Sequence, residues 1–309
     1  MSENMNQDDI SLIDLYKILW KKKIYILLTS FSVAFACLFY ANSLEDIYRS
    51  ETLLAPSSDS DSAPSMGMFS GVASIAGINI PSNTSANNVL ISIERLKSLD
   101  FFEMVVDKHN LYYELEAVNG WNSANNTLIV NTDIYDDKKN QWISDDEFAI
   151  NGRPSIQKIH SNFLENFSVY YDNKNGFVSL SVDHFSPHVA KKILEIFIKE
   201  INETTRNEDI STAQQIISYL EEENLNTRNI DLKLGINSLI QSQIKKIAIA
   251  NSSPQYVLKV ISPPYAPESK FSPSRLLIVL IGFFLGSIFS SMFFIFYRIY
   301  LNEFNSTEE

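Results

Sequence analysis

Two long runs of uncharged, mostly apolar residues lie near the ends of the chain and set its outline. Residues 24–44 are 21 positions without a charge, and residues 276–297 are 22. At about 1.5 Å per residue, a helix of either length slightly exceeds the roughly 30 Å thickness of a bilayer's hydrocarbon core. We therefore predict two membrane-spanning helices, with residues 1–23 before the first and residues 298–309 after the second.

Basic residues beside the first apolar run predict its orientation. Four lysines precede the run and only Arg49 follows it closely, so the positive-inside rule places the N-terminus in the cytoplasm. A cleaved signal peptide is the alternative, but the preceding segment is 23 residues long and carries Asp8, Asp9 and Asp14, unlike a short basic leader. Two spans return the C-terminus to the same side, and residues 45–275 then form one large loop outside the cytoplasm. The four lysines are Lys17, Lys21, Lys22 and Lys23.

The loop mixes strand-like alternation with helical periodicity, which predicts an α+β domain. A helix is expected at residues 88–111, where apolar residues share one face. Residues 57–88 are rich in Ser, Asn and Gly, and we expect a flexible loop there. Alternating segments with β-branched and aromatic residues predict strands at residues 46–55, 127–137, 165–172, 176–186 and 256–264.

The strongest helical pattern begins at Ser186 and Pro187, a favourable N-cap and first helical residue. A continuous helix over residues 187–250 would be about 96 Å long. A compact domain of this size is only about 45 Å across. Such a helix must protrude, so that neighbouring copies of the chain cover its apolar stripe, or it must break. The candidate break points are residues 207–209, residues 224–226 and Gly235.

Composition argues against nucleic-acid binding and offers little for catalysis. The formal net charge is -12, the opposite of a surface that binds phosphates. His184, His188 and Asp183 could be metal ligands, but a strand end followed by a helix cap explains their positions. Acidic residues within 133–148 could supply paired carboxylates to a tethered glycan-active enzyme, yet they fall in turn-like sequence. We therefore predict no catalytic residue, no metal and no cofactor.

Two motifs flank the predicted spans. "DDISLIDLYKILWKKK", residues 8–23, places Trp20 among lysines, as suits the headgroup layer. "SPPYAPESKFSPSR", residues 262–275, holds four prolines. Because prolines keep a chain extended without hydrogen-bond partners, we predict a stiff strut that leads into the second span. Within that span, Gly282 and Gly286 form a small-xxx-small pair that permits close helix approach.

These motifs resemble those of the polysaccharide co-polymerases, the chain-length determinant (Wzz-like) proteins. The first resembles the family's D-x-I-[DS]-L-x-x-L-x-x-x-L-W-x-x-K entry, and the second its P-x-x-P-x4-S-P-K run. Ser274 stands where Lys is usual, although Arg275 can substitute, and Ser290 stands where a second Gly is usual. The small-residue segment "FSGVASIAGINI" also resembles the family. The matching motif positions are Asp9, Ile10, Ser11, Leu12, Leu15, Leu19, Trp20, Lys23, Pro264, Pro267, Ser272 and Pro273.

The resemblance implies a non-enzymatic regulator of O-antigen chain length in lipopolysaccharide biosynthesis. It implies an α+β periplasmic domain with a long protruding helix, anchored in the inner membrane by two transmembrane helices, with both termini cytoplasmic. The implied partners are further copies of the chain in an octamer-like ring, the O-antigen polymerase, lipid-linked polysaccharide and the membrane, but no nucleic acid. Three alternatives stay open: enterobacterial common antigen, capsule, and a tethered periplasmic enzyme that acts on glycan.

Overall fold

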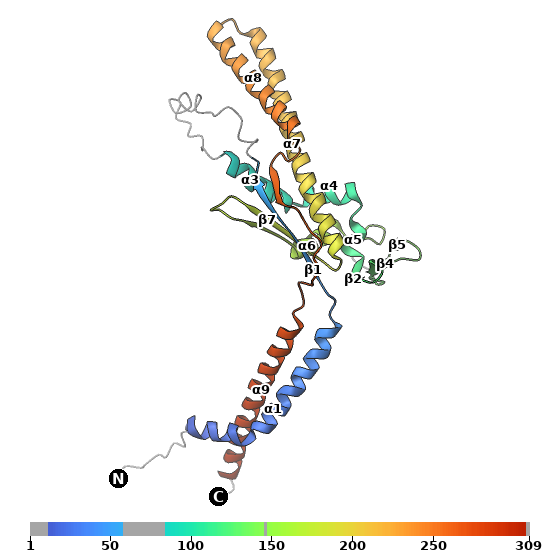
Figure 1. Cartoon of the computed structure of the whole chain (residues 1–309), viewed down its shortest axis with the longest axis vertical. Coiled ribbons are helices and arrows are strands. Elements are labelled where there is room, and N and C mark those ends of the chain that lie inside the picture. The colour runs from blue at the N-terminus through green and yellow to red at the C-terminus, as the bar shows by residue number, and fades with distance from the viewer. Residues whose placement is uncertain (1–11, 58–83, 145–146, 307–309) are drawn as a thin grey trace, which may run out of the picture. The chain divides into compact units, whose positions relative to one another are not determined.

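The computed structural model describes residues 12–57, 84–144 and 147–306, and the chain divides into two compact units (Figure 1). The helix unit comprises Met1–Asp46 and Phe271–Glu309, and the α+β unit comprises Ile47–Lys270. The predicted α+β fold class is confirmed, and the described strands all lie in the α+β unit.

The helix unit consists of two long apolar helices that lie against each other, α1 (Leu12–Ser43) and α9 (Arg275–Ser306). The segments Leu19–Ser43 and Arg275–Tyr297 are long and apolar enough to cross a membrane. Most of their large apolar side chains are exposed, as expected for helices surrounded by lipid. The two predicted apolar helices are confirmed, and the first begins before residue 24.

Four antiparallel strands form the centre of the α+β unit, in the order β6–β7–β1–β8. In β7, Val178, Leu180 and Val182 point into the core, whereas Ser179 and Ser181 point to the opposite face. This alternation is the pattern from which the strands were predicted, and four of the five predicted segments contain these strands. The strands are β1 (Tyr48–Pro56), β6 (Phe167–Tyr171), β7 (Val178–His184) and β8 (Leu258–Ser262).

Helices pack on one face of this sheet and enclose an aromatic core. The rings of Phe102, Phe163 and Phe197 pack together, with centroids 4.9 Å apart for Phe102 and Phe163 and 5.0 Å apart for Phe163 and Phe197. Their burial provides much of the hydrophobic stabilisation of the unit. The helices of this layer are α3 (Thr84–Leu96), α4 (Leu99–His109), α6 (Ile156–Asn166) and the first half of α7 (Pro187–Asn226).

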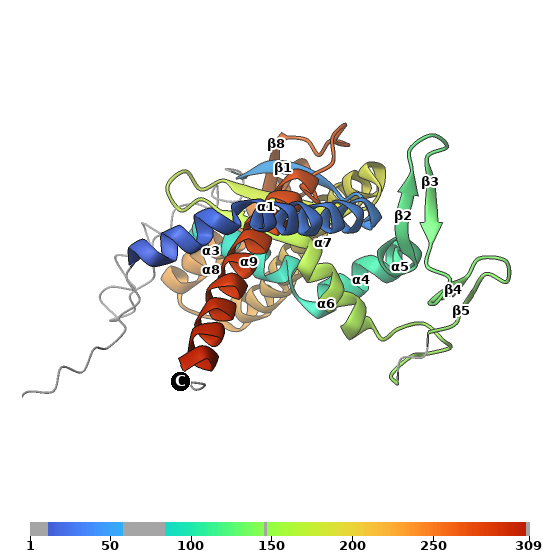
Figure 2. The ribbon, with the colours of Figure 1, turned by 90° about the horizontal axis from the view of Figure 1, so that it is seen from below.

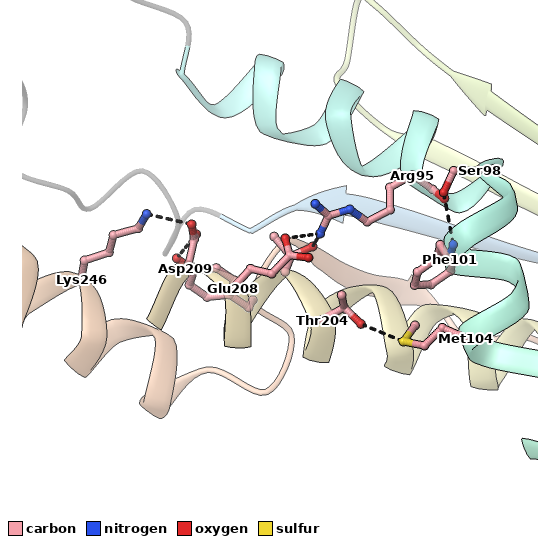
Figure 3. Close-up of polar contacts among 10 residues, drawn as sticks. Arg95, Ser98, Phe101, Met104, Thr204, Glu208, Asp209 and Lys246 are labelled. Carbon is pink, nitrogen blue, oxygen red and sulfur yellow. Dashed lines mark hydrogen bonds and ion pairs between the residues drawn. The ribbon is translucent and has the colours of Figure 1, made fainter. Parts of the chain in front are cut away.

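The single helix predicted at residues 88–111 is wrong, because the structure has two helices there. Ser98 begins α4 as its N-cap, and the Ser98 side chain accepts a hydrogen bond from the backbone N–H of Phe101 (Figure 3). A serine side chain that satisfies a free N–H favours a new helix start over continuation of the previous one. The loop predicted at residues 57–88 lies mostly outside the described residues, and its last part already belongs to α3.

Two small hairpins follow the short helix α5 (Tyr112–Glu116) (Figure 2). The strand predicted at residues 127–137 is split between them, because a turn at residues 131–134 separates β3 from β4. The acids of residues 133–148 lie in and around these turns, except Asp145 and Asp146, which are outside the described residues. The hairpin strands are β2 (Val118–Asn122), β3 (Thr127–Val130), β4 (Tyr135–Asp136) and β5 (Gln141–Trp142).

The long helical segment is a hairpin of α7 and α8 (Ile230–Ser252) (Figure 1). A continuous helix over residues 187–250 is therefore wrong, and a break close to residues 224–226 is confirmed. Asn229 ends the connection as the N-cap of α8, where its side chain accepts hydrogen bonds from the N–H groups of Asp231 and Leu232. The break lets α8 fold back and cover part of the apolar stripe of α7.

Polar contacts hold the middle of α7 to its neighbours (Figure 3). Lys246 of α8 lies 2.9 Å from Asp209, and Arg95 of α3 lies 2.6 Å from Glu208. Asn202 is buried about two turns earlier, and its side-chain oxygen accepts hydrogen bonds from the N–H groups of Val257 and Leu258. These contacts fix α7 against α3, α8 and the segment that leads into β8.

Candidate functional site

Small residues line the contact between α1 and α9. A Cβ atom added at Gly282 would lie 2.5 Å from Sγ of Cys37, and one added at Gly286 would lie 3.1 Å from Cα of Ser30. Neither position has room for a larger side chain, which is the packing that a small-xxx-small pair allows. The structure thus places both glycines against the other apolar helix of the same chain. The remaining buried small residues of this contact are Ala34, Ala41 and Ser290.

Arg275 joins the beginning of α9 to the end of α1. Its Nε donates to the backbone carbonyl of Ala41 at 3.2 Å, and its Nη2 donates to Asp46 at 2.9 Å. The carbonyl belongs to the last turn of α1, where backbone acceptors lack intrahelical partners. Arg275 therefore satisfies a helix terminus as well as forming an ion pair, which explains a basic residue at this motif position.

Trp20 lies on α1 with 59% of its surface exposed. The Nζ atom of Lys23 is 4.3 Å from the centre of the Trp20 ring, in a cation–π arrangement. An exposed tryptophan beside lysines at the end of an apolar helix is typical of the membrane interface. The place of Trp20 near the headgroups stays a prediction.

The proline-rich segment begins docked on β1. After β8 ends, Thr52 donates to the carbonyl of Ser262 and Ser50 donates to the carbonyl of Tyr265, both at 2.7 Å. Pro264 is buried between these two points. Proline lacks the N–H needed to extend a sheet, so side-chain hydroxyls of β1 replace the usual backbone ladder.

The remaining motif residues of this segment are not brought together as a single site. Pro267 is half-buried within the α+β unit. Ser272 and Pro273 are half-buried in the helix unit, just before α9. The segment therefore belongs to both units, and its motif positions are spread along it.

His184 and Asp183, two of the three residues considered as metal ligands, make other contacts. Nε2 of His184 contacts the carbonyl of Glu114 at 2.8 Å, and Nδ1 accepts from the N–H of Ser186 at 2.9 Å. Burial lowers the pKa of His184 and keeps the ring neutral. Asp183 instead binds Arg49 through two hydrogen bonds, which raise the pKa of Arg49. Across residues 12–57, 84–144 and 147–306, no group of three or more His, Cys, Asp or Glu side chains could hold a metal ion.

One buried charge was not predicted from the sequence. Glu200 of α7 is only 1% exposed, and its carboxylate lies 2.8 Å from both Nζ of Lys108 and Nε2 of His109. Burial alone would raise the pKa of Glu200, but the hydrogen bonds from Lys108 and His109 outweigh it and lower the pKa. The only hint in the sequence is an acid between the apolar residues Phe197 and Ile201 on a helical face.

The architecture defines the protein's class: a two-span candidate membrane protein whose α+β domain lies in the sequence between the two apolar helices. Residues 8–109 match the family model of the chain length determinant protein, Wzz, so the resemblance predicted from the motifs is confirmed. This match supports a role in setting polysaccharide chain length. Comparison with curated proteins finds no match.

Two solved structures are similar to the chain at low sequence identity. A full-length bacterial polysaccharide co-polymerase aligns at 11% identity, with 94% of this chain and 99% of that chain covered and a TM-score of 0.39. A fragment of WzzB, a polysaccharide co-polymerase from Salmonella Typhimurium, aligns at 11% identity, with 74% of this chain and 100% of that chain covered and a TM-score of 0.35. Because both TM-scores are low, the family resemblance rests on the sequence match.

Proposed function

We propose that the protein is a non-enzymatic regulator of O-antigen chain length, which acts with the inner-membrane O-antigen polymerase on lipid-linked polysaccharide. The observation that carries this proposal is the match of residues 8–109 to the chain length determinant family. The two apolar helices support a membrane anchor, and the lysines before the first span support cytoplasmic termini with a periplasmic α+β unit.

Exposed apolar side chains on the helical hairpin support assembly of several copies, for which we propose an octamer-like ring. Leu225 is 85% exposed, Ile230 75% and Leu234 63%, and all three lie close to the connection between α7 and α8. Several large apolar side chains gathered in water are typical of an interaction surface. A neighbouring copy that covers them would remove this apolar area from water.

In this proposal the polymerase catalyses glycosyl transfer, and this protein controls only the length of the product. In this proposal the α+β unit and its copies determine when growth of a chain ends, and the proline-rich segment is a stiff connection between the sheet and the second span. The docking of Ser262 and Tyr265 on β1 supports such a connection, because it holds the first part of the segment to the sheet. Gly282 and Gly286 would keep the two spans together within the membrane.

Deletion of the gene tests the proposal directly. Electrophoresis of lipopolysaccharide from the deleted strain should show O-antigen that persists but has lost its preferred length. If O-antigen is unchanged while enterobacterial common antigen or capsule loses its preferred length, the regulator serves that glycan instead. Unchanged length distributions for all three glycans, or complete loss of polymer, would contradict a role in length control.

A further inference from the structure

The face of the sheet opposite the helices carries a hollow of about 410 Å³. It lies over β7, where Ser179 is flanked by Tyr170 of β6 and Leu53 of β1, and where Ser181 is flanked by Ser168 of β6 and Glu51 of β1. Residues directly opposite each other on antiparallel strands have neighbouring side chains. The small side chains of Ser168, Ser179 and Ser181, beside larger residues of β6 and β1, therefore create the hollow.

The lining of the hollow is rich in hydroxyl groups. Seven of its eleven lining residues are Ser, Thr or Tyr. Two of them, Tyr170 and Tyr265, keep 68% and 53% of their surface exposed. Hydroxyl groups both donate and accept hydrogen bonds, and a tyrosine ring also offers an apolar face. This combination suits a ligand that is itself covered with hydroxyl groups.

Charged groups on the same face add directional contacts. Arg49 lines the hollow and is held in place by its two hydrogen bonds to Asp183. Glu51 lines it as well, is exposed, and can accept hydrogen bonds from ligand hydroxyls. An acidic group beside the site, in a protein with a net charge of -12, disfavours nucleic acid. With only Leu53 and Leu180 as aliphatic residues, the lining is also too polar to seat an apolar helix.

We infer that this hollow binds sugar units of the polysaccharide whose length the protein regulates. The inference rests on the proposed function and adds to it a place of contact between regulator and glycan. The volume of the hollow lies within the roughly 300–1,000 Å³ that is usual for small-molecule sites. Tyr170 and Tyr265 contact the apolar faces of the sugar rings, while Glu51 and the serines bind their hydroxyl groups.

The test uses the full-length protein in detergent and the surface polysaccharide released from the source cells by mild acid. Calorimetric titration measures binding by the wild type and by two variants. Tyr170→Ala should weaken binding by about tenfold, the usual scale of one lost aromatic contact. Ser181→Trp should fill the hollow and remove measurable binding. The matched controls are Tyr219→Ala and Ser161→Trp, at exposed positions on α7 and α6, and both should bind as the wild type does.

Three outcomes would overturn the inference. They are absence of binding by the wild type, wild-type affinity in both hollow variants, and dissociation of the oligomer in Ser181→Trp with unchanged affinity in Tyr170→Ala. The last would identify this face as a contact between copies. If Ser181→Trp does not fold, the exposed Tyr170→Ala variant decides alone. The titration tests only glycan binding at the hollow, so a negative result there does not affect the proposed function. The proposed function is tested separately, by the glycan lengths of the deleted strain.

Discussion

Gly282 lies so close to Cys37 that a Cβ atom on the glycine would be 2.5 Å from the cysteine Sγ. Gly282 belongs to α9, the last helix of the described chain, and Cys37 belongs to α1, the first. The glycine spacing in the second apolar helix therefore allows contact with the first apolar helix of the same chain. This pairing accounts for the small residues on α1, which a lipid-facing helix does not require.

A disulfide tests this pairing. In Gly282→Cys, mild oxidation should join the new thiol to Cys37 within one chain, because the added Cβ would lie 3.0 Å from Cβ of Cys37. A small separation of the two helices relieves this crowding and gives the Cβ–Cβ distance of about 3.8 Å that a disulfide needs. Non-reducing electrophoresis should show no dimer, and thiol alkylation followed by mass spectrometry should show two protected cysteines. Leu280→Cys is the control. Leu280 is exposed, so the thiol introduced there should form no disulfide with Cys37 and should remain open to alkylation. A disulfide-linked dimer of Gly282→Cys would instead place the glycines between chains.

The proline-rich segment should matter for length control and not for insertion. Replacing Pro264, Pro267 and Pro273 with Ser removes backbone restriction and leaves the apolar helix untouched. We expect normal expression and membrane insertion, a lost preferred glycan length and unchanged total polymer, all measured in the deleted strain. Pro254→Ser, at an exposed position before β8, is the control. A normal length distribution in the triple variant would show that stiffness is irrelevant.

Assembly should depend on the exposed apolar residues of the helical hairpin. Leu225→Asp and Leu234→Asp together should lower the oligomeric mass in mild detergent, because each aspartate would be buried without a partner between copies. Light scattering measures the mass. Ile129→Asp, exposed on β3, should leave it unchanged. A wild type that is itself a monodisperse monomer would count against the ring.

Acid should destabilise the α+β unit through His184. Burial lowers the pKa of His184 in the folded state, so the folded protein favours the neutral ring. The resulting stability is present above the unfolded pKa of about 6.5 and is lost as pH falls toward the folded pKa. Denaturant unfolding should show a declining free energy of unfolding below pH 6.5, and His184→Asn should reduce that slope. Equal slopes in both proteins would exclude His184 as the cause.

Glu200 should stabilise the fold as a charge. Glu200→Gln should lower the free energy of unfolding by about 1–3 kcal/mol, the usual cost of an impaired buried polar contact. The lowered pKa of Glu200 means that this contribution is present above the unfolded pKa near ~4.3 and is lost in stronger acid. Chemical denaturation at pH 7 measures the difference. If the midpoint and slope of the denaturation curve are unchanged in Glu200→Gln, the contacts of Lys108 and His109 with this carboxylate contribute nothing to stability.

Sequence patterns predicted the elements that depend on local periodicity. Alternation gave β1 and β7, uncharged length gave α1 and α9, and Ser186 with Pro187 marked the beginning of α7. The split at Ser98 and the break before Asn229 were harder to place, since periodic apolar residues continue across both. A serine or asparagine can either cap a new helix or lie within a continuing one, and tertiary packing decides between the two. The periodicity of apolar residues contains no information on that choice.

The contacts between distant segments could not be predicted from one sequence. Glu200 meets Lys108 and His109 only after α4 packs on α7, and the hollow exists only because β6, β7 and β1 pair in this register. Likewise, the spacing of Gly282 and Gly286 predicts close helix packing, but nothing in the sequence pattern marks Cys37, within the apolar run of residues 24–44, as the partner of Gly282. Which two side chains meet is determined by the folded chain, whereas a sequence motif identifies only one of the two.

A regulator that sets glycan length without making the glycan should pass one complementation experiment. The gene is returned on a plasmid to the deleted strain, and both total O-antigen and its length distribution are measured from radiolabelled lipopolysaccharide on a gel. We expect the plasmid to restore the preferred length, and the total amount of O-antigen to be the same with and without the plasmid. A change in total polymer with no preferred length restored would contradict it.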